Sequence, residues 1–120
     1  MTHHFDVRVK RIYDEPADDD GYRVLIDHIW PRGVSRDRAR LDDWARELAP
    51  SDDLRRWFAH DPAKFSEFRA RYRHELAGSG VVSDLATRAA SGRVTVLYAA
   101  RDLAHNNAVV VAELLRDHAR

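Results

Sequence analysis

The chain of 120 residues contains no cysteine, and this absence removes several kinds of chemistry. Without a thiol there is no disulfide, no thiolate nucleophile and no zinc or iron–sulfur site built on cysteine. Glycine is also scarce, with 5 residues, and none of them forms the glycine-rich loop of a P-loop enzyme. No serine lies in the sequence pattern of a nucleophile elbow. The sequence therefore excludes thiol catalysis and P-loop nucleotide chemistry.

Long apolar runs and net charge are missing as well. No segment approaches the ~18 apolar residues that indicate a membrane span, and residues 1–10 lack the apolar region of a signal peptide. Twenty basic residues balance twenty acidic ones, so no overall field attracts nucleic acid or an anionic membrane. We expect a cytoplasmic protein in which residues 1–120 form a single domain with one hydrophobic core.

The spacing of apolar residues divides this domain into strands and helices. Residues 5–13 alternate like a half-buried strand, whereas 22–30 and 93–100 are apolar on both faces, which is typical of central strands. Capping residues and helical spacing predict helices at about 35–40, 51–58, 61–76, 83–91 and 102–119. Alternation of strands and helices predicts an α/β single-domain layered fold, with a small, mostly parallel sheet flanked by helices. Only about eight residues join the first two strands, which is short for a parallel crossover, so we expect a mixed sheet.

Polar residues gather where two of the predicted strands end. The first of these strands ends in Trp30 and Arg32, and the second is followed by Arg101 and Asp102. Ligands of open α/β sheets bind just beyond the carboxyl ends of parallel strands. The first turn of the next helix, residues 105–107, would add backbone N–H groups that favour an anion. The sequence therefore predicts a pocket for a small anionic molecule, such as a phosphate or a carboxylate.

Asp27 is unusual because it interrupts an otherwise apolar strand. An ionised carboxylate in a strand interior must be paired or hydrogen-bonded, or must have a raised pKa. One interpretation is a general base beside the pocket. The other is an ion pair with Arg11, Arg32 or Arg101 that holds the strand ends together. The sequence leaves both open.

Histidines supply the second acid–base candidate. His60 lies on a loop before the predicted helix 61–76, where an imidazole can exchange protons near neutral pH. His28 should point to the opposite face of the strand from Asp27, so we expect it to be structural. Asp27, His60 and His105 lack the spacing of a recognised metal motif, so we predict no metal and no cofactor.

Two other function classes remain as alternatives. Arginines at 32–46 and 69–73 could contact nucleic acid, although acidic residues surround both segments. Trp44 and Trp57 could anchor a protein interface if they were exposed. We expect a charged, solvated surface in the first case, and the sequence leaves the second open.

Several segments then bring a known family into view. "KRIYD", "DGYRVLIDHIWPRGVS", "WARELAPS", "LRRWFAHDP" and "VTVLYAARDLAHNNAVVVAELL" follow one another in this order. Over nearly its whole length the chain resembles the YeaO-like branch of the domain of unknown function 488 family. The resemblance implies a small cytoplasmic α/β protein, widespread in bacteria and without a known reaction. It also implies that residues 41–50, whose spacing alone favours a helix, form a strand leading into a loop.

The resemblance covers most of the polar candidates. The matching positions are Lys10, Arg11, Asp27, Trp30, Arg32, His60, Asp61, Asp102, His105, Asn106 and Asn107. His28, Ala59 and Arg101 depart from it, since members usually have Arg, Gly and Lys there. Shorter relatives carry cysteines where Tyr98 and Asn106 stand, and a histidine in place of Asn107. Their thiol or metal chemistry therefore cannot carry over to this chain.

The resulting prediction is a polar pocket that binds a small anionic ligand, nucleotide-like or phosphate-like. If the protein is a hydrolase-type or transferase-type enzyme, Asp27 and His60 are the acid–base candidates. A non-catalytic sensor, carrier or regulatory module with a protein or nucleic-acid partner is the alternative. The predicted ligand-binding residues are Arg11, Trp30, Arg32, Arg101, Asp102, His105, Asn106 and Asn107.

Overall fold

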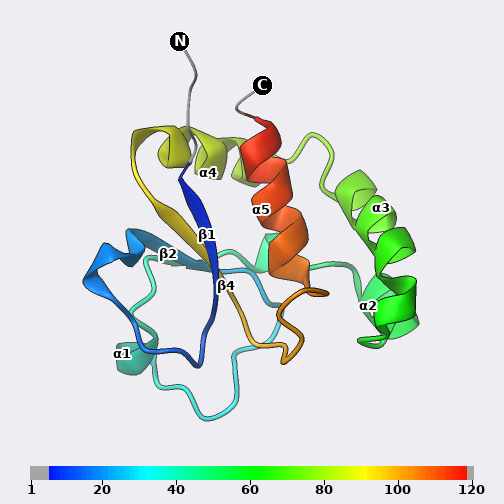
Figure 1. The fold of residues 1–120 in the computed structure, drawn as a ribbon, viewed down its shortest axis with the longest axis horizontal. Helices are drawn as coiled ribbons and strands as arrows, with labels where there is room; N and C mark the ends of the chain where they lie inside the picture. The colour runs from blue at the N-terminus through cyan, green and yellow to red at the C-terminus, as the bar shows by residue number, and fades with distance from the viewer. Residues whose placement is uncertain (1–5, 119–120) are drawn as a thin grey trace.

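The computed structural model describes residues 6–118, which form a parallel sheet with helices packed against it (Figure 1). Its strands are β1 (Val7–Arg11), β2 (Tyr22–Leu25), β3 (Asp43–Trp44) and β4 (Val94–Tyr98). They lie in the order β1-β4-β2-β3, and each neighbouring pair is parallel. The predicted α/β class and the parallel character of the sheet are confirmed. Four predicted limits lie outside the described residues: the strand start at residue 5, the helix end at 119 and the domain limits at 1 and 120.

No antiparallel pair occurs in the sheet of residues 6–118, so the expectation of a mixed arrangement is corrected. The short connection suggested an antiparallel hairpin, but β1 and β2 are not neighbours. The last strand, β4, lies between them and pairs with both. Residues 12–21 run from the end of β1 back to the start of β2 and cross the one strand between them, β4. An extended chain of ~3.3 Å per residue can cover this path.

The helices follow from capping side chains. Ser35, Ser51, Ser79 and Asn106 each accept a hydrogen bond from a backbone N–H in the first turn of the helix that follows. These helices are α1 (Arg36–Ala39), α2 (Asp52–Phe58), α4 (Gly80–Ser91) and α5 (Asn107–Asp117). The remaining helix, α3 (Phe65–Glu75), follows a 3₁₀ turn at Pro62–Lys64 that Asp61 caps. The other 3₁₀ turns are Asp18–Asp20 and Arg46–Leu48.

Several boundaries differ from the sequence prediction. Strand β2 ends at Leu25 rather than at residue 30, and α5 begins at Asn107 rather than at 102. Helix α4 begins at Gly80, three residues before the predicted start. Residues 41–50 form β3 and a 3₁₀ turn, as the family resemblance implied and helical spacing did not.

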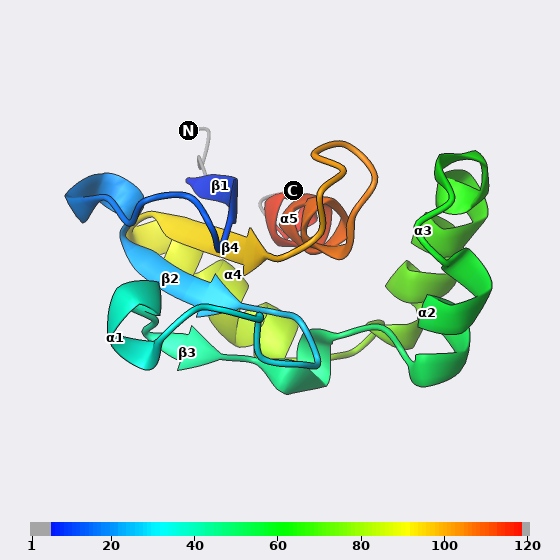
Figure 2. The ribbon, with the colours of Figure 1, turned by 90° about the horizontal axis from the view of Figure 1, so that it is seen from below.

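The core is unequally divided between the two faces of the sheet. The larger cluster joins one face to α4 and α5, and it includes Val24, Val94, Val96, Leu85 and Val111. The smaller cluster covers the other face beneath α1, and it contains Ile12, Leu25, Val34, Ala39 and Leu97. Figure 2 shows the strands side by side in the order β1-β4-β2-β3.

Helices α2 and α3 form an arm that projects from the rest of the molecule (Figures 1 and 2). Stacked rings of Phe58 and Phe68, with centroids 4.2 Å apart, join the two helices. Ion pairs from Arg69 to Glu113 and from Arg73 to Asp117 connect the arm to α5. Within residues 6–118, no helix is long and apolar enough to cross a membrane.

Candidate functional site

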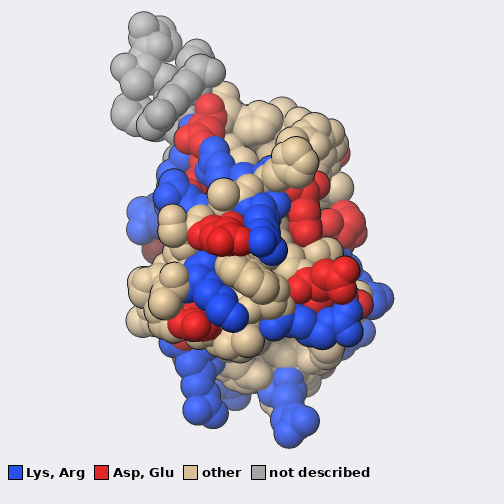
Figure 3. Space-filling view, turned by 90° about the vertical axis from the view of Figure 1, so that its right-hand side faces the viewer, with Lys and Arg blue, Asp and Glu red and all other residues tan. Residues whose placement is uncertain are grey.

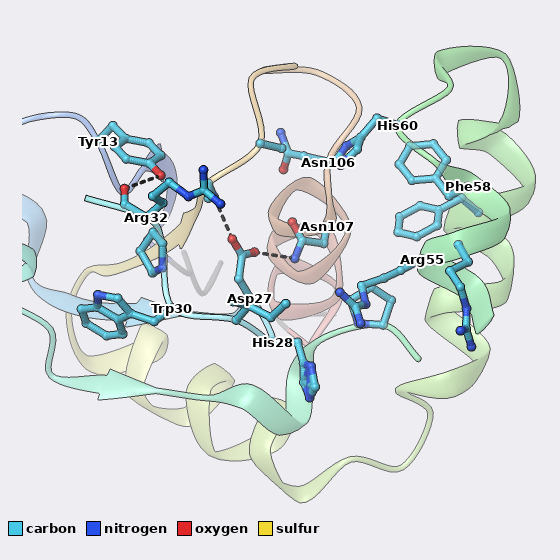
Figure 4. A pocket seen from close by; sticks show the side chains of 17 residues that line it. Tyr13, Asp27, His28, Trp30, Arg32, Arg55, Phe58, His60, Asn106 and Asn107 are labelled. Atoms are coloured by element: carbon cyan, nitrogen blue, oxygen red, sulfur yellow. Dashed lines mark hydrogen bonds between the residues drawn. The ribbon is translucent and has the colours of Figure 1, made fainter. Parts of the chain in front are cut away.

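A cavity of about 650 Å³ lies at the carboxyl edge of the sheet, bounded on its far side by the α2–α3 arm (Figure 4). This volume falls within the range of small-molecule sites. The exits of β2 and β4 form one wall, and residues of α2 and the following turn form the other. The lining residues are Tyr13, Asp27, His28, Ile29, Trp30, Pro31, Arg32, Pro50, Arg55, Arg56, Phe58, His60, Phe68, Ala99, Ala100, Asn106 and Asn107.

Asp27 joins the separate elements that meet at this cavity. One carboxylate oxygen accepts a hydrogen bond from the Ala99 N–H at 2.9 Å, and the other accepts one from Asn107 Nδ2 at 2.9 Å. Its carbonyl oxygen accepts a hydrogen bond from Trp44 Nε1 at 2.7 Å. The side chain therefore connects the exits of β2 and β4 with the start of α5.

The position and partners of Asp27 differ from the sequence prediction. Because β2 ends at Leu25, Asp27 lies just beyond the strand rather than inside it. Its hydrogen-bond partners are neutral groups, and the ion pair with Arg11, Arg32 or Arg101, one of the two interpretations left open, does not form in the described residues. Burial raises the pKa of Asp27, although both hydrogen bonds and the charges of Arg55 and His60 lower it in part.

Arg11 does not line the cavity but supports one of its walls. Its Nε donates to the carbonyl oxygen of Ala100 at 2.9 Å, and its Nη2 donates to that of Ala99 at 3.0 Å. These bonds hold the segment whose N–H group binds Asp27. The predicted role of Arg11 as a ligand-binding residue requires it to face the cavity. Instead, Arg11 holds the backbone of this wall in place.

Trp30 and Arg32, both predicted as ligand residues, line the cavity. Trp30 Nε1 donates to the carbonyl oxygen of Val34 at 2.6 Å, and its ring meets that of Trp44 edge to face at 5.3 Å. These contacts fix the orientation of the indole. Arg32 is exposed, and the Tyr13 hydroxyl donates to its carbonyl oxygen at 3.0 Å.

The segment after β4 contributes less than predicted. Asp102 accepts hydrogen bonds from the backbone N–H groups of Ala104 and His105, so it caps a turn rather than α5. The His105 ring lies 2.9 Å from the Asp102 carboxylate and packs against Phe65. Arg101, Asp102 and His105 do not line the cavity.

The two asparagines at the start of α5 do line it, in different ways. Asn106 is buried, and its Oδ1 accepts the N–H of Val109 at 3.0 Å as the helix N-cap. Only Asn107 extends a side-chain donor to Asp27. The predicted helix start at residue 102 was wrong, because Asn106 and not Asp102 is the N-cap of α5.

His60 lines the cavity as predicted, but it comes with an arm that the sequence reasoning missed. Arg55, Arg56 and Phe58 of α2 form the wall opposite Trp30 and Arg32 (Figure 4). Arg55 pairs with Asp52, and Arg56 pairs with Asp53 at 2.9 Å. The segment "LRRWFAHDP" was a signal for this wall, but apolar periodicity does not show which edge of the sheet a helix faces.

The turn that carries His60 has an unusual backbone. Ala59 and His60 have φ values of 49° and 57°, in the left-handed region that residues with a Cβ rarely occupy. Ala59 ends α2, and its N–H donates to the carbonyl oxygen of Arg55. Consecutive strained residues at a cavity wall are a feature of binding and catalytic sites.

His28 was expected to be structural, on the far side of a strand. Since β2 ends before it, strand alternation does not apply, and His28 lines the cavity beneath Asp27 (Figure 4). Its Nδ1 is buried without a hydrogen-bond partner in residues 6–118. The only other buried side-chain polar atom in that state within the described residues is Arg55 Nε, which belongs to the same cavity lining.

The structure also places the residues of the two alternative functions, nucleic-acid binding and a protein interface. Arg69, Arg71 and Arg73 pair with Glu113, Glu67 and Asp117, and Figure 3 shows acidic and basic side chains interspersed on this side. Trp57 is half-buried, with Lys64 and Arg71 against its ring. The part of the chain from 6 to 118 contains no group of three metal-ligating side chains suited to an ion.

Comparisons with known proteins identify relatives of this chain. The family model described as "Inactive DUF488-N3 subclade" matches residues 6–120. An uncharacterized protein of Mycobacterium tuberculosis is 42% identical over 109 residues, which are 91% of this chain and 92% of that protein. The uncharacterized protein YeaO of Escherichia coli is 38% identical over 111 residues, 92% of this chain and 96% of its own. No solved structure matches the chain.

Proposed function

We propose that this chain, which belongs to the inactive DUF488-N3 subclade, binds a small anionic molecule in the cavity and releases it unchanged. The observation that carries the proposal is the composition of the cavity wall. Three arginines, Arg32, Arg55 and Arg56, and two histidines, His28 and His60, surround a single carboxylate. Such an excess of cationic and donor groups in a concave site favours an anion.

Binding without conversion is supported by the commitments of the polar residues. Asp27 accepts hydrogen bonds on both oxygens and joins three elements, so it acts as a fixed acceptor. Tyr98 and Asn106, which stand where the shorter relatives carry cysteines, are both buried, and the Asn106 side chain is bonded to the backbone of Asp102 and Val109. The description of the subclade as inactive agrees with this assignment. The protein would thus serve as a sensor or a carrier.

A thermal-shift screen tests the proposal. The purified protein is heated with nucleoside monophosphates, sugar phosphates, small carboxylates and inorganic phosphate. A ligand present at a hundred times its dissociation constant adds about 2.7 kcal/mol, which raises the midpoint by several degrees for a domain of this size. Each hit is then incubated with the protein and examined by NMR spectroscopy for conversion.

The location of binding is tested with two variants of identical chemistry. Asp27→Asn changes the carboxylate of the cavity, whereas Asp84→Asn changes an exposed carboxylate on α4. We expect Asp27→Asn to change the thermal shift, because it removes the one negative charge of the cavity lining, and Asp84→Asn to leave it unchanged. Equal responses of the two variants, silence of the whole panel, or turnover of a bound compound would each contradict the proposal.

A further inference from the structure

Two polar atoms in the cavity have unmet hydrogen-bonding capacity. Buried polar atoms are almost always hydrogen-bonded, and each exception calls for an explanation. Within residues 6–118 the exceptions among side chains are His28 Nδ1 and Arg55 Nε, and both residues line the same cavity. Both atoms have almost no accessible surface, so each side chain must rotate toward the cavity to meet a ligand there.

Both side chains also act on one carboxylate. The pKa of Asp52 is lowered by the hydrogen bond and charge of Arg55 and, to a smaller degree, by the charge of His28. Arg55 uses Nη2 for Asp52, which leaves Nε for another acceptor. His28 can donate from Nδ1 in one of its tautomers. Together the two atoms form a pair of donors without an acceptor.

Asp27 has the opposite need. An ionised carboxylate has about four acceptor positions, and the Ala99 N–H and Asn107 Nδ2 fill two of them. Burial raises its pKa because the remaining positions are poorly solvated and no cation binds them directly. A hydrogen-bond donor on a ligand would stabilise the ionised form.

We infer that the ligand is held at two points: an anionic oxygen accepts hydrogen bonds from His28 Nδ1 and Arg55 Nε, and a nitrogen-bound hydrogen is donated to Asp27. This inference rests on the proposed function and names the chemical class of the ligand. A cavity of about 650 Å³ with Trp30 and Phe58 in its walls suits a ring-bearing compound of nucleotide size rather than a free amino acid. The class is an anionic compound with a ring or amino N–H group.

Arg56 provides a matched control for Arg55. The two arginines are adjacent on α2, both line the cavity, and each pairs with an aspartate three residues earlier. Only Arg55 has a buried Nε without a partner. Replacement by lysine keeps the positive charge and removes the Nε donor. A difference between Arg55→Lys and Arg56→Lys therefore reports on the hydrogen bond and not on the charge.

Isothermal titration calorimetry measures this difference. The probes are the four common nucleoside 5′-monophosphates, the same nucleosides without phosphate, inorganic phosphate alone and free amino acids. We expect at least one monophosphate to bind about tenfold or more tightly than its nucleoside or than phosphate. Arg55→Lys should weaken its binding about 10- to 100-fold, and Arg56→Lys less than about fivefold. Asp27→Asn should weaken the monophosphate but not inorganic phosphate.

Folding is checked independently of binding. The midpoint of thermal unfolding without ligand should agree between the two lysine variants, and the imidazole nitrogens of His28 should change their NMR shifts when the monophosphate is added to the parent protein. Equal weakening in both lysine variants, an unchanged His28 spectrum, or a preference for amino acids over monophosphates would overturn the inference. Binding of another anion that ignores Arg55 would overturn it and leave the proposed function intact. Absence of binding of every anionic probe to the parent protein would overturn the proposed function itself.

Discussion

Two aspartates with restricted access to water show how differently this fold treats the same side chain. Asp20 lies on the face of the sheet opposite α4 and α5, where Lys10 Nζ is 3.2 Å from both of its oxygens and Arg23 Nη1 is 2.5 Å from one. Asp27 lies at the carboxyl edge and is bound by two neutral donors. Burial raises the pKa of both carboxyls, but the hydrogen bonds to Asp20 outweigh it and leave a lowered pKa. At Asp27 the pKa stays raised.

The difference separates a structural carboxylate from one that is available. Arg23 is also buried, and its remaining donors bind the carbonyl oxygen of Ala39, so the charges around Asp20 are mutually satisfied. Arg55 and His60 act on Asp27 only through their charge, and both line the cavity together with it. A complete network stabilises the fold, whereas an incomplete one beside a cavity leaves room for a ligand.

The largest expected effect concerns the turn next to Asp20. Gly21 has φ of 68°, and a Cβ there would lie 2.3 Å from the carbonyl oxygen of Arg93. That oxygen cannot retreat, because it accepts the N–H of Tyr22 at 2.9 Å. We expect Gly21→Ala to lower the free energy of unfolding by more than about 3 kcal/mol, measured by urea denaturation.

Gly33, near the cavity, is the matched control for this change. Its φ is 79°, but a Cβ would meet no atom within 4 Å. Gly33→Ala should therefore cost only the backbone strain of about 1 kcal/mol. Similar losses in the two variants would show that the tight packing around Gly21 does not distinguish the two regions.

Breaking the Asp20 network is the next largest perturbation. Asp20→Asn leaves Arg23 buried with an incomplete partner, and removal of one member of a buried pair costs about 3 kcal/mol or more. Since the folded pKa of Asp20 is lowered, its stabilising contribution is present above the unfolded pKa of about 3.9 and is lost as the pH falls. The deficit of the variant should thus shrink between pH 7 and pH 3 in urea denaturation. A deficit that is constant with pH would contradict the ionic origin.

Asp27→Asn should have the opposite sign. Because the folded pKa of Asp27 is raised, ionisation of this group opposes folding, and its unfavourable contribution grows as the pH rises from the unfolded pKa through the folded one. We expect the variant to be more stable than the parent by about 1 kcal/mol at pH 7, with the gain vanishing in acid. Urea denaturation across this pH range measures it. A loss of stability at pH 7 would mean that the bridge between β2, β4 and α5 is its main role.

The sequence predicted the carboxyl-edge location because that inference needs only strand ends. Six of the predicted residues line the cavity, since each closely follows or precedes a strand or helix that the sequence marks clearly. They are Asp27, Trp30, Arg32, His60, Asn106 and Asn107. Arg101, Asp102 and His105 do not, because competition between two helix caps decides which residues face inward, and spacing cannot resolve it. Arg55 was missed for another reason. Its role depends on how the α2–α3 arm folds back toward the sheet, which is a tertiary contact.

The two regions also differ in what the sequence shows of them. The Asp20 network was missed altogether, because "DDD" in a loop is typical of a solvated turn. Only the crossing of residues 12–21 over the sheet brings Asp20 to Lys10 and Arg23. The sheet order was unpredictable for a related reason, since β4 pairs with strands more than 70 residues earlier in the chain. Local pattern marks elements, and long-range pairing places them.

The smallest expected effect lies in the strained turn of the cavity wall. Ala59 ends α2 in the left-handed conformation, with φ 49° and ψ 37°, and Arg40 ends α1 in the same way, with φ 48° and ψ 47°. Glycine removes this strain, but it also makes the unfolded chain more flexible, which increases the entropic cost of folding. We therefore expect each glycine variant to raise the free energy of unfolding by about 0.5 kcal/mol. Differential scanning calorimetry should show a similar rise in the midpoint of thermal unfolding for Ala59→Gly and Arg40→Gly.

Only one of these two glycine variants should affect the ligand. His60 follows Ala59 directly and lines the cavity, whereas Arg40 lies at the end of the distant α1. With glycine at position 59 the turn is more flexible, and the His60 ring must be ordered when the ligand binds. Ala59→Gly should therefore weaken the affinity for the ligand found in the thermal-shift screen about two- to fivefold. Arg40→Gly should leave its affinity unchanged. If both variants bind equally well, the strain at Ala59 serves the folding of the arm and not the site that the arm completes.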